Sequence, residues 1–179
     1  MKTSFTVGLF LLTASTIVAA DAQWVLDRST LTYHVSHILH ESEGVSHSAR
    51  GKGTCHNGQC DFLIAVPVKS FDSGDSNRDL HMIQVTRGSE FPLVSVRTHL
   101  PEAMSGASTI LVDLDVEFGG QKVHYKQIAF ERVAQGTQTK ISGTVPLALS
   151  DFRIDPPKLL TVAVKNEVPL KVELVWHVQ

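Results

Sequence analysis

Alternation of apolar and polar residues along the chain is the feature that most restricts its fold. In 110–118 the even positions are all apolar, and the odd positions from Asp113 onward are charged. Successive side chains of a β-strand point to opposite faces, so this period of two places one face in an apolar interior and the other in water. The pattern therefore predicts an all-β fold. The other segments with strand character are 31–36, 62–68, 94–98, 123–130, 141–149, 161–164 and 170–176.

Turn signals separate these segments. They are Asn57-Gly58, Gly119-Gly120, Gly136 and Pro156-Pro157. Connections of hairpin length favour antiparallel neighbours, and about eight strands suit a sandwich or a closed barrel. The interior of a barrel with about eight strands is either packed solid or holds one small ligand. Alternation alone does not distinguish a solid interior from one that holds a ligand.

One segment breaks the period of two. Residues 73–82 show no alternation, and Asp75 or Ser76 could cap a short helix in which Leu80 and Ile83 share a face. We therefore expect a helical insertion near residues 75–83 between two strands.

The N-terminus has the composition of a secretory signal peptide. Met1-Lys2 is followed by an apolar run over 5–20, and Ala20-Asp21-Ala22 has the small-x-small pattern of a cleavage site. The run is shorter than the ~20 residues of a membrane-spanning helix. We expect a signal peptide at 1–22, a mature domain at 23–179 and a periplasmic or secreted location, where disulfides are permitted.

Charge and motifs give no indication of nucleic-acid binding or catalysis. The formal net charge is −2 and basic residues are scattered, so no nucleic-acid partner is expected. Gly-x-Ser-x-Gly and His-Glu-x-x-His motifs are absent from the sequence. His34, His37 and His40 would alternate between the faces of a strand, so no metal site is predicted. The motifs therefore indicate no reaction.

Both cysteines lie in the segment CHNGQC. Asn57-Gly58 is a preferred two-residue type I′ turn, which makes Cys55 and Cys60 a directly opposed cross-strand pair. Such pairs have Cα atoms about 4.5 Å apart, within disulfide range. Haem attachment and thioredoxin chemistry both need a Cys-x-x-Cys spacing, and a zinc site would need two more ligands. The segment therefore predicts a structural disulfide between Cys55 and Cys60.

Three further segments resemble the YceI-like family of bacterial periplasmic and secreted proteins. Residues 24–37 are similar to the family's opening strand, which ends in Val-Ser-His. Residues 70–82, with Phe91-Pro92 after them, are similar to its Arg-Asp-x-His-Leu/Met segment. Residues 149–154 are similar to its Arg-Ser-Asp-Phe-Gly-Ile turn, although Leu149 and Arg153 replace the Arg and the Gly.

This resemblance implies a lipocalin-like antiparallel barrel of eight strands with an apolar tunnel for a long isoprenoid lipid. It implies a binding or carrier protein, not an enzyme, for a polyprenyl chain or a prenylated quinone such as ubiquinone, with no cofactor besides this lipid. Some relatives accompany electron-transfer membrane proteins, so such a protein, or a second copy of this chain, is a candidate partner. The alternatives are a small secreted redox or metal (haem) module, or an accessory interaction domain without a lipid.

Alternation and the resemblance together nominate the site. His37, Arg78, Asp79 and His81 are the candidates for the mouth and the lipid head group, although Arg78 could instead pair with Asp75 or Asp79. The predicted tunnel residues are Leu31, Tyr33, Val35, Phe62, Ile64, Val66, Val68, Val94, Val96, Val112, Leu114, Val116, Phe118, Leu170, Val172, Leu174 and Trp176.

Overall fold

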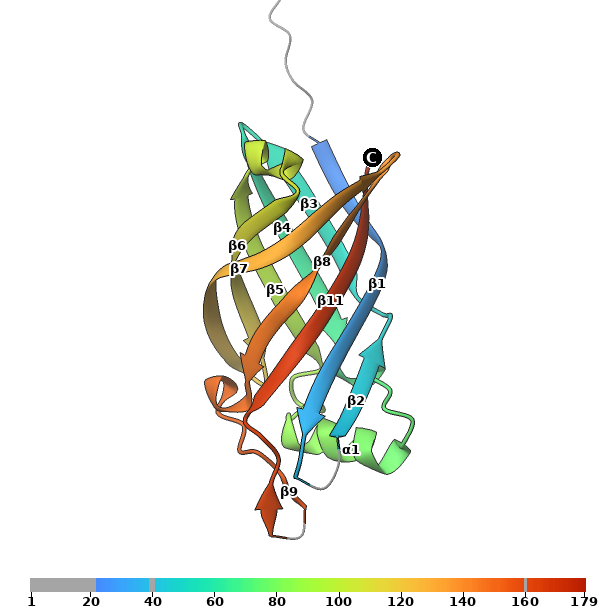
Figure 1. The fold of residues 1–179 in the computed structure, drawn as a ribbon, viewed down its shortest axis with the longest axis vertical. Coiled ribbons are helices and arrows are strands. Elements are labelled where there is room, and N and C mark those ends of the chain that lie inside the picture. The colour runs from blue at the N-terminus through green and yellow to red at the C-terminus, as the bar shows by residue number, and fades with distance from the viewer. Residues whose placement is uncertain (1–21, 39–40, 160) are drawn as a thin grey trace, which may run out of the picture.

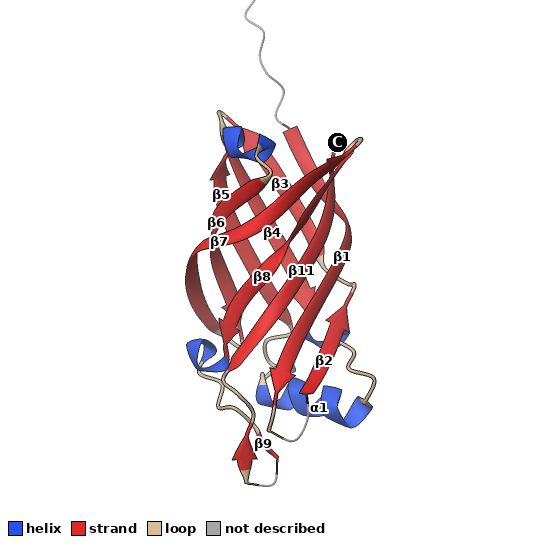
Figure 2. Ribbon diagram, in the orientation of Figure 1, coloured by secondary structure: helices blue, strands red, loops and turns tan. Residues whose placement is uncertain are grey.

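The computed structural model describes residues 22–38, 41–159 and 161–179. Apart from Ala22, the predicted signal peptide lies outside the described residues. The strands wind around a common axis in one twisted sheet (Figures 1 and 2). The strands of this sheet are β1 (Ala22–Ser36), β2 (Glu41–Ser46), β3 (Arg50–His56), β4 (Gln59–Pro67), β5 (Leu93–Pro101), β6 (Thr109–Phe118), β7 (Gln121–Gln135), β8 (Gln138–Ala148) and β11 (Glu167–Val178).

Pairing of β1 with β11 closes the sheet into a barrel. The order is β11-β8-β7-β6-β5-β4-β3-β1-β2, and Leu31 opposite Val172 is one pair of the closing seam. The other edge of β1 pairs with β3 through Ala22–Val25 and with β2 through Leu31–Ser36. Thus β2 and β3 share one place around the barrel, and the predicted eight-stranded antiparallel barrel is confirmed.

Two details of the strand prediction change. Within 161–164 only β10 (Val162–Ala163) is a strand, and it pairs with β9 (Lys158–Leu159) outside the barrel. Its expected place in the barrel is taken by β2 and β3; the sequence predicted only the end of β3, at the hairpin that contains Cys55. The more buried positions of β3 are Gly51, Gly53 and Cys55, so this strand has no apolar alternation to detect.

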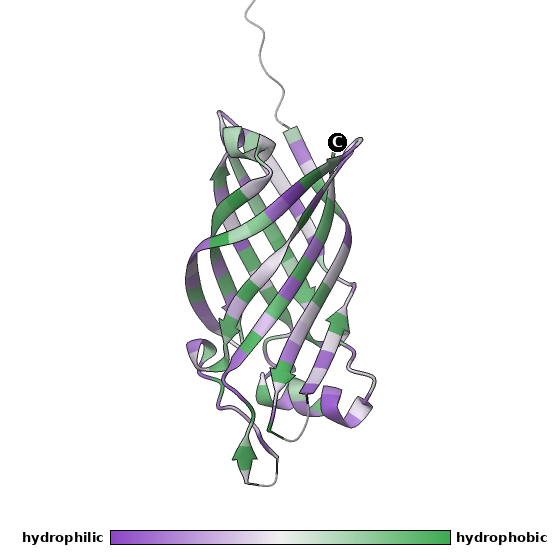
Figure 3. Cartoon of the chain, in the orientation of Figure 1, coloured by the Kyte–Doolittle hydropathy of each residue, from purple (hydrophilic) through white to green (hydrophobic). Residues whose placement is uncertain are grey.

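Hydropathy follows the strands in the expected manner. Figure 3 shows hydrophobic and hydrophilic residues alternating along them. The buried set includes Leu114 on β6, Val145 on β8, and both Val172 and Trp176 on β11. In the described part of the chain, no helix has both the length and the hydropathy needed to cross a membrane.

The predicted helix is α1 (Ser76–Val85), which lies at the lower end of the barrel in Figure 1. Asp75 is its N-cap, and its carboxylate accepts hydrogen bonds from the backbone N–H groups of Asn77 and Arg78 at 2.9 and 3.2 Å. These bonds satisfy two of the free donors of the first turn. Short 3₁₀ helices η1 (Val68–Ser70), η2 (Glu102–Gly106) and η3 (Leu149–Phe152) complete the fold.

The turn after β8 is anchored by an aromatic side chain. Phe152, at the end of η3, is 2% exposed, and its ring meets Phe118 edge to face at 5.3 Å. Arg153 then adopts a left-handed conformation with φ of 54°. Glycine takes this conformation without the steric penalty of a side chain, which explains why glycine suits this position in the resembling family.

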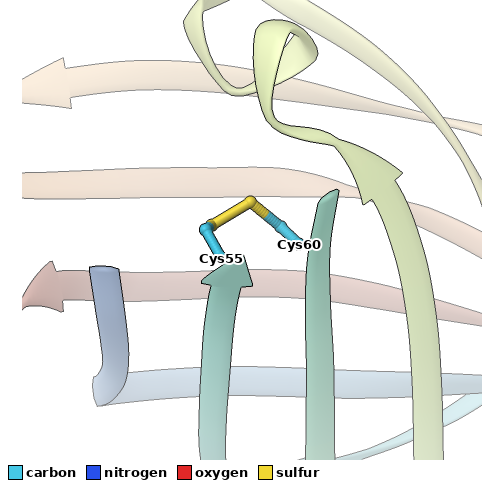
Figure 4. The surroundings of a disulfide bond; sticks show 2 residues. All are labelled: Cys55 and Cys60. Atoms are coloured by element: carbon cyan, nitrogen blue, oxygen red, sulfur yellow. A yellow bond between two sulfur atoms is a disulfide. The ribbon is translucent and has the colours of Figure 1, made fainter. Parts of the chain in front are cut away.

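The hairpin between β3 and β4 has the predicted geometry. Asn57 and Gly58 have φ of 51° and 78°, and His56 lies opposite Gln59. Cys55 and Cys60 are directly opposed, with Cα atoms 4.0 Å apart, and they form the predicted disulfide (Figure 4). Ala22 pairs with Cys55, so the disulfide lies beside the start of β1, at the end of the barrel opposite α1.

Removing this disulfide should weaken the fold moderately. A Cys55→Ala, Cys60→Ala double variant is expected to lose about 2 kcal/mol of unfolding free energy, because the closed loop is short. Urea denaturation measures the loss, and the wild type in dithiothreitol should show a similar one. Failure of the variant to fold would contradict this limited structural role.

Candidate ligand-binding cavity

The barrel is hollow. It encloses a cavity of about 450 Å³, lined by residues from β1, β2, β4 to β8 and β11 and by α1. Cavities that bind small molecules typically measure about 300–1,000 Å³. Of the two interiors that the sequence left open, the structure has the one with room for a ligand.

Every tunnel residue predicted from the sequence lies on the wall of this cavity. They alternate along their strands, as in β6, where Ile110, Val112, Leu114 and Val116 are 7%, 5%, 5% and 4% exposed. The predicted wall residues are Leu31, Tyr33, Val35, Phe62, Ile64, Val66, Val68, Val94, Val96, Val112, Leu114, Val116, Phe118, Leu170, Val172, Leu174 and Trp176.

Strands β7 and β8 supply a part of the wall that was not predicted from the sequence. In β7 a bulge breaks the alternation: Gln127 has φ of 55°, and the register with β6 shifts there. The more buried residues of β7 therefore have odd numbers before the bulge and even numbers after it. Along β8 the wall residues all have odd numbers, so the period of two could have identified them from the sequence. The wall residues missed on these strands are Phe130, Arg132, Thr139, Ile141, Val145 and Leu147.

Glycines opposite aromatic residues help to keep the cavity open. Several aromatic rings on the wall lie directly over a glycine, where the absence of a side chain leaves room for the ring. An added Cβ would meet the ring closely, at 2.6 Å for both Gly143 against Phe130 and Gly51 against Trp176. The rings can therefore lie along the wall instead of across the lumen. Two further pairs of this kind, both direct cross-strand partners, are Gly44 with Tyr33 and Gly53 with Phe62.

Adding a methyl group at one of these glycines should narrow the cavity. Gly53→Ala is expected to push the Phe62 ring into the lumen, lowering stability by about 1–3 kcal/mol and the affinity for a cavity ligand by about tenfold. Gly106→Ala is the control, because no atom lies within 4 Å of its added Cβ. Ligand titration and urea denaturation measure both effects. Adding Phe62→Leu should restore binding; failure to restore it would contradict the role of the ring.

Aromatic side chains gather toward the disulfide end of the cavity. Phe62 lies 5.3 Å from Trp176 and 6.3 Å from Trp24, measured between ring centroids. All three line the cavity. They are apolar groups of large area, suited to contact with a hydrocarbon chain.

Polar side chains line the cavity at both ends: Arg132 and Thr139 lie toward the disulfide end, where Thr139 is opposite Trp176, and other polar side chains lie at the α1 end. Of the four predicted mouth residues, Arg78 and His81 line the cavity. His37 and Asp79 are not among the lining residues. The His37 ring is hydrogen bonded to the carbonyl oxygen of Val162 at 3.2 Å. Asp79 accepts hydrogen bonds from the backbone N–H and the hydroxyl of Ser73 at 3.1 and 2.6 Å.

Tyr33 brings a hydroxyl group to the same end. Burial raises the pKa of this hydroxyl, the nearby Asp79 carboxylate raises it further, and the Arg78 guanidinium opposes the increase. The hydroxyl is therefore neutral at physiological pH and can donate a hydrogen bond. The Tyr33 ring also lies 5.5 Å from that of Phe71, which lines the cavity beside it.

Three solved structures share this architecture. BcnA from Burkholderia cenocepacia has a TM-score of 0.70 and 17% identity, and the match covers 82% of this chain and 95% of BcnA. A polyisoprenoid-binding domain from Saccharophagus degradans, implicated in plant cell wall breakdown, has a TM-score of 0.70 and 14% identity, covering 87% of this chain and 98% of that domain. A YceI protein from Campylobacter jejuni has a TM-score of 0.51 and 12% identity, covering 64% and 70%.

This chain has the YceI-like fold. The resemblance seen in three sequence segments is thus confirmed at the level of the fold. No protein-family model matches the sequence, and a search of curated proteins finds no match.

Within this YceI-like barrel, the chemistry of the wall favours binding of an apolar chain. The wall is mostly aliphatic and aromatic. Its polar groups include Ser42, Arg78, His81 and Lys158 near the α1 end and Arg132 and Thr139 toward the disulfide end. Both cysteines are joined in the disulfide. Among the described residues, no group of three or more His, Cys, Asp or Glu side chains is placed to hold a metal ion.

Proposed function

We propose that this protein binds a long-chain isoprenoid lipid inside its barrel, either a polyprenyl chain or a prenylated quinone such as ubiquinone, and carries or sequesters it. The observation that carries the proposal is the hollow barrel of about 450 Å³ with an almost entirely hydrocarbon wall. The polyisoprenoid-binding domain of Saccharophagus degradans has the same fold, which supports this class of ligand.

The physical chemistry of the cavity suits such a chain. A polyisoprenoid is a flexible branched hydrocarbon, and each CH₂ group removed from water contributes about 0.8 kcal/mol. The aliphatic wall offers no hydrogen bond over most of its length, so it selects for an apolar tail rather than for a polar molecule. Ordering of the chain offsets part of this gain.

The proposal is for a binding protein, not an enzyme, with the lipid as its only bound group. Its place of action would be the periplasm or the outside of the cell, where the buried disulfide is stable. It would exchange the lipid with a membrane, with a membrane electron-transfer protein or with a second copy of the chain.

Intrinsic fluorescence tests the proposal. Both tryptophans of the chain, Trp24 and Trp176, line the cavity, so a bound ligand contacts them directly. Titration with geranylgeraniol should give a saturable change in tryptophan emission, and ubiquinone should compete for the same site. Absence of a saturable change with both ligands would contradict the proposed function.

A further inference from the structure

Charged side chains on the cavity wall are all of one sign. Arg78, Arg132 and Lys158 line the cavity together with His81, and no carboxylate is among the described lining residues. The chain as a whole has 18 acidic residues against 16 Lys and Arg, so composition alone does not produce this bias. A cation beside an apolar cavity is costly unless an anion or hydrogen-bond acceptors accompany it.

Arg78 is incompletely paired. It lies in the first turn of α1, and its buried Nε has no hydrogen-bond partner among the described residues. Its ion pair with Asp75 is long, with Nη2 3.9 Å from Oδ2. The other oxygen of Asp75 caps the helix, and Asp79 accepts two hydrogen bonds from Ser73. The guanidinium therefore retains donors for a group inside the cavity.

Other donors lie at the same end. The neutral hydroxyl of Tyr33 is close enough to Arg78 for the guanidinium to influence its pKa. His81 is one helical turn after Arg78, and Lys158 lines the cavity from β9. A planar guanidinium that shares one end of a cavity with an ammonium group and a hydroxyl is a set of donors suited to carboxylate and phosphate recognition.

We propose that the ligand of this cavity carries an anionic head group, a phosphate or a carboxylate, that Arg78 binds at the α1 end. The apolar tail then extends toward Trp24 and Trp176 at the disulfide end. This inference rests on the proposed function and narrows it, because a neutral isoprenoid is then the weaker ligand.

Three ligands with the same geranylgeranyl chain test this preference. They are the alcohol, the carboxylic acid and the monophosphate, each titrated below its critical micelle concentration and followed by tryptophan emission. At least one of the two anions should bind tenfold or more tightly than the alcohol, and the ratio between the two anions identifies the preferred head group. Equal affinity for all three ligands overturns the inference but leaves the proposed function intact, whereas failure of all three to bind contradicts the proposed function itself.

Variants locate the head group. Arg78→Gln should bring the affinities for anion and alcohol within threefold of each other, and a circular dichroism spectrum that matches the wild type reports correct folding. Arg78→Lys, which keeps the charge, should retain part of the preference and serves if the glutamine variant fails to fold. Lys69→Gln is the matched control, because Lys69 is exposed, lies near α1 and does not line the cavity. If Arg132→Gln loses the preference for the anionic ligands while Arg78→Gln retains it, the assignment of the head group to Arg78 is overturned.

Discussion

Replacement of Val112 by tryptophan is expected to weaken lipid binding strongly and leave the barrel folded. Val112 lies in the middle of β6, is 5% exposed and lines the cavity. A tryptophan side chain at this position projects into the lumen and occupies the volume that an isoprenoid tail would need. We expect the affinity for geranylgeraniol to fall by a factor of about 100, which corresponds to about 2.7 kcal/mol.

The adjacent residue supplies a matched control. Leu111 is 45% exposed and lies on the outer face of the same strand. Leu111→Trp therefore adds the same side chain outside the cavity, and its affinity should stay within twofold of wild type. Native mass spectrometry with added geranylgeraniol measures both variants. Equal lipid uptake by the two variants would place the lipid outside the barrel.

Truncation of Phe152 is expected to have the largest effect on stability. Its ring is almost completely buried at the α1 end of the barrel and packs against Phe118 and Tyr125, with centroids 5.3 and 6.4 Å away. Phe152→Ala removes these contacts and leaves a void, so the free energy of unfolding should fall by about 3–5 kcal/mol.

Urea denaturation monitored by circular dichroism measures this loss. Leu80→Ala is the control, because Leu80 is 59% exposed on α1 and its truncation should change stability by less than about 0.5 kcal/mol. A loss below about 1 kcal/mol for Phe152→Ala would mean that the turn after β8 does not anchor the barrel.

Most residues of the barrel wall could be predicted from the sequence, because side chains of a strand alternate between its two faces. Whether a residue has an even or an odd number therefore decides whether it points inward or outward. Along β6, each even residue faces the interior, and 110–118 contains no interruption. Where this relation fails, prediction fails for a physical reason. The left-handed Gln127 inserts a residue into β7 and changes the parity after it, and glycines occupy the more buried positions of β3.

Whether the interior is solid or hollow could not be predicted from alternation. Inward-facing valines and leucines are compatible with both a solid and a hollow interior. Which of the two forms depends on how the large aromatic rings pack. Gly53 lies opposite Phe62 and Gly143 opposite Phe130, so both rings have room along the wall. Such cross-strand pairs become visible only when the register is known.

The mouth was predicted only in part because the residues of a helix point in several directions. Arg78, His81, Met82 and Val85 share one face of α1 at helical spacing, and all four line the cavity. Asp79 lies off this face and hydrogen bonds to Ser73. Applying the helical period to 75–83 would have separated Arg78 and His81 from Asp79.

Native mass spectrometry of the purified wild-type protein, followed by organic extraction, tests the central claim most directly. We expect one lipid per chain, with the fragmentation pattern of an isoprenoid, that stays bound under gentle ionisation and is absent from Val112→Trp. A wild-type protein that purifies without lipid and takes up neither geranylgeraniol, geranylgeranyl phosphate nor ubiquinone would contradict the claim that the barrel is an isoprenoid-binding site.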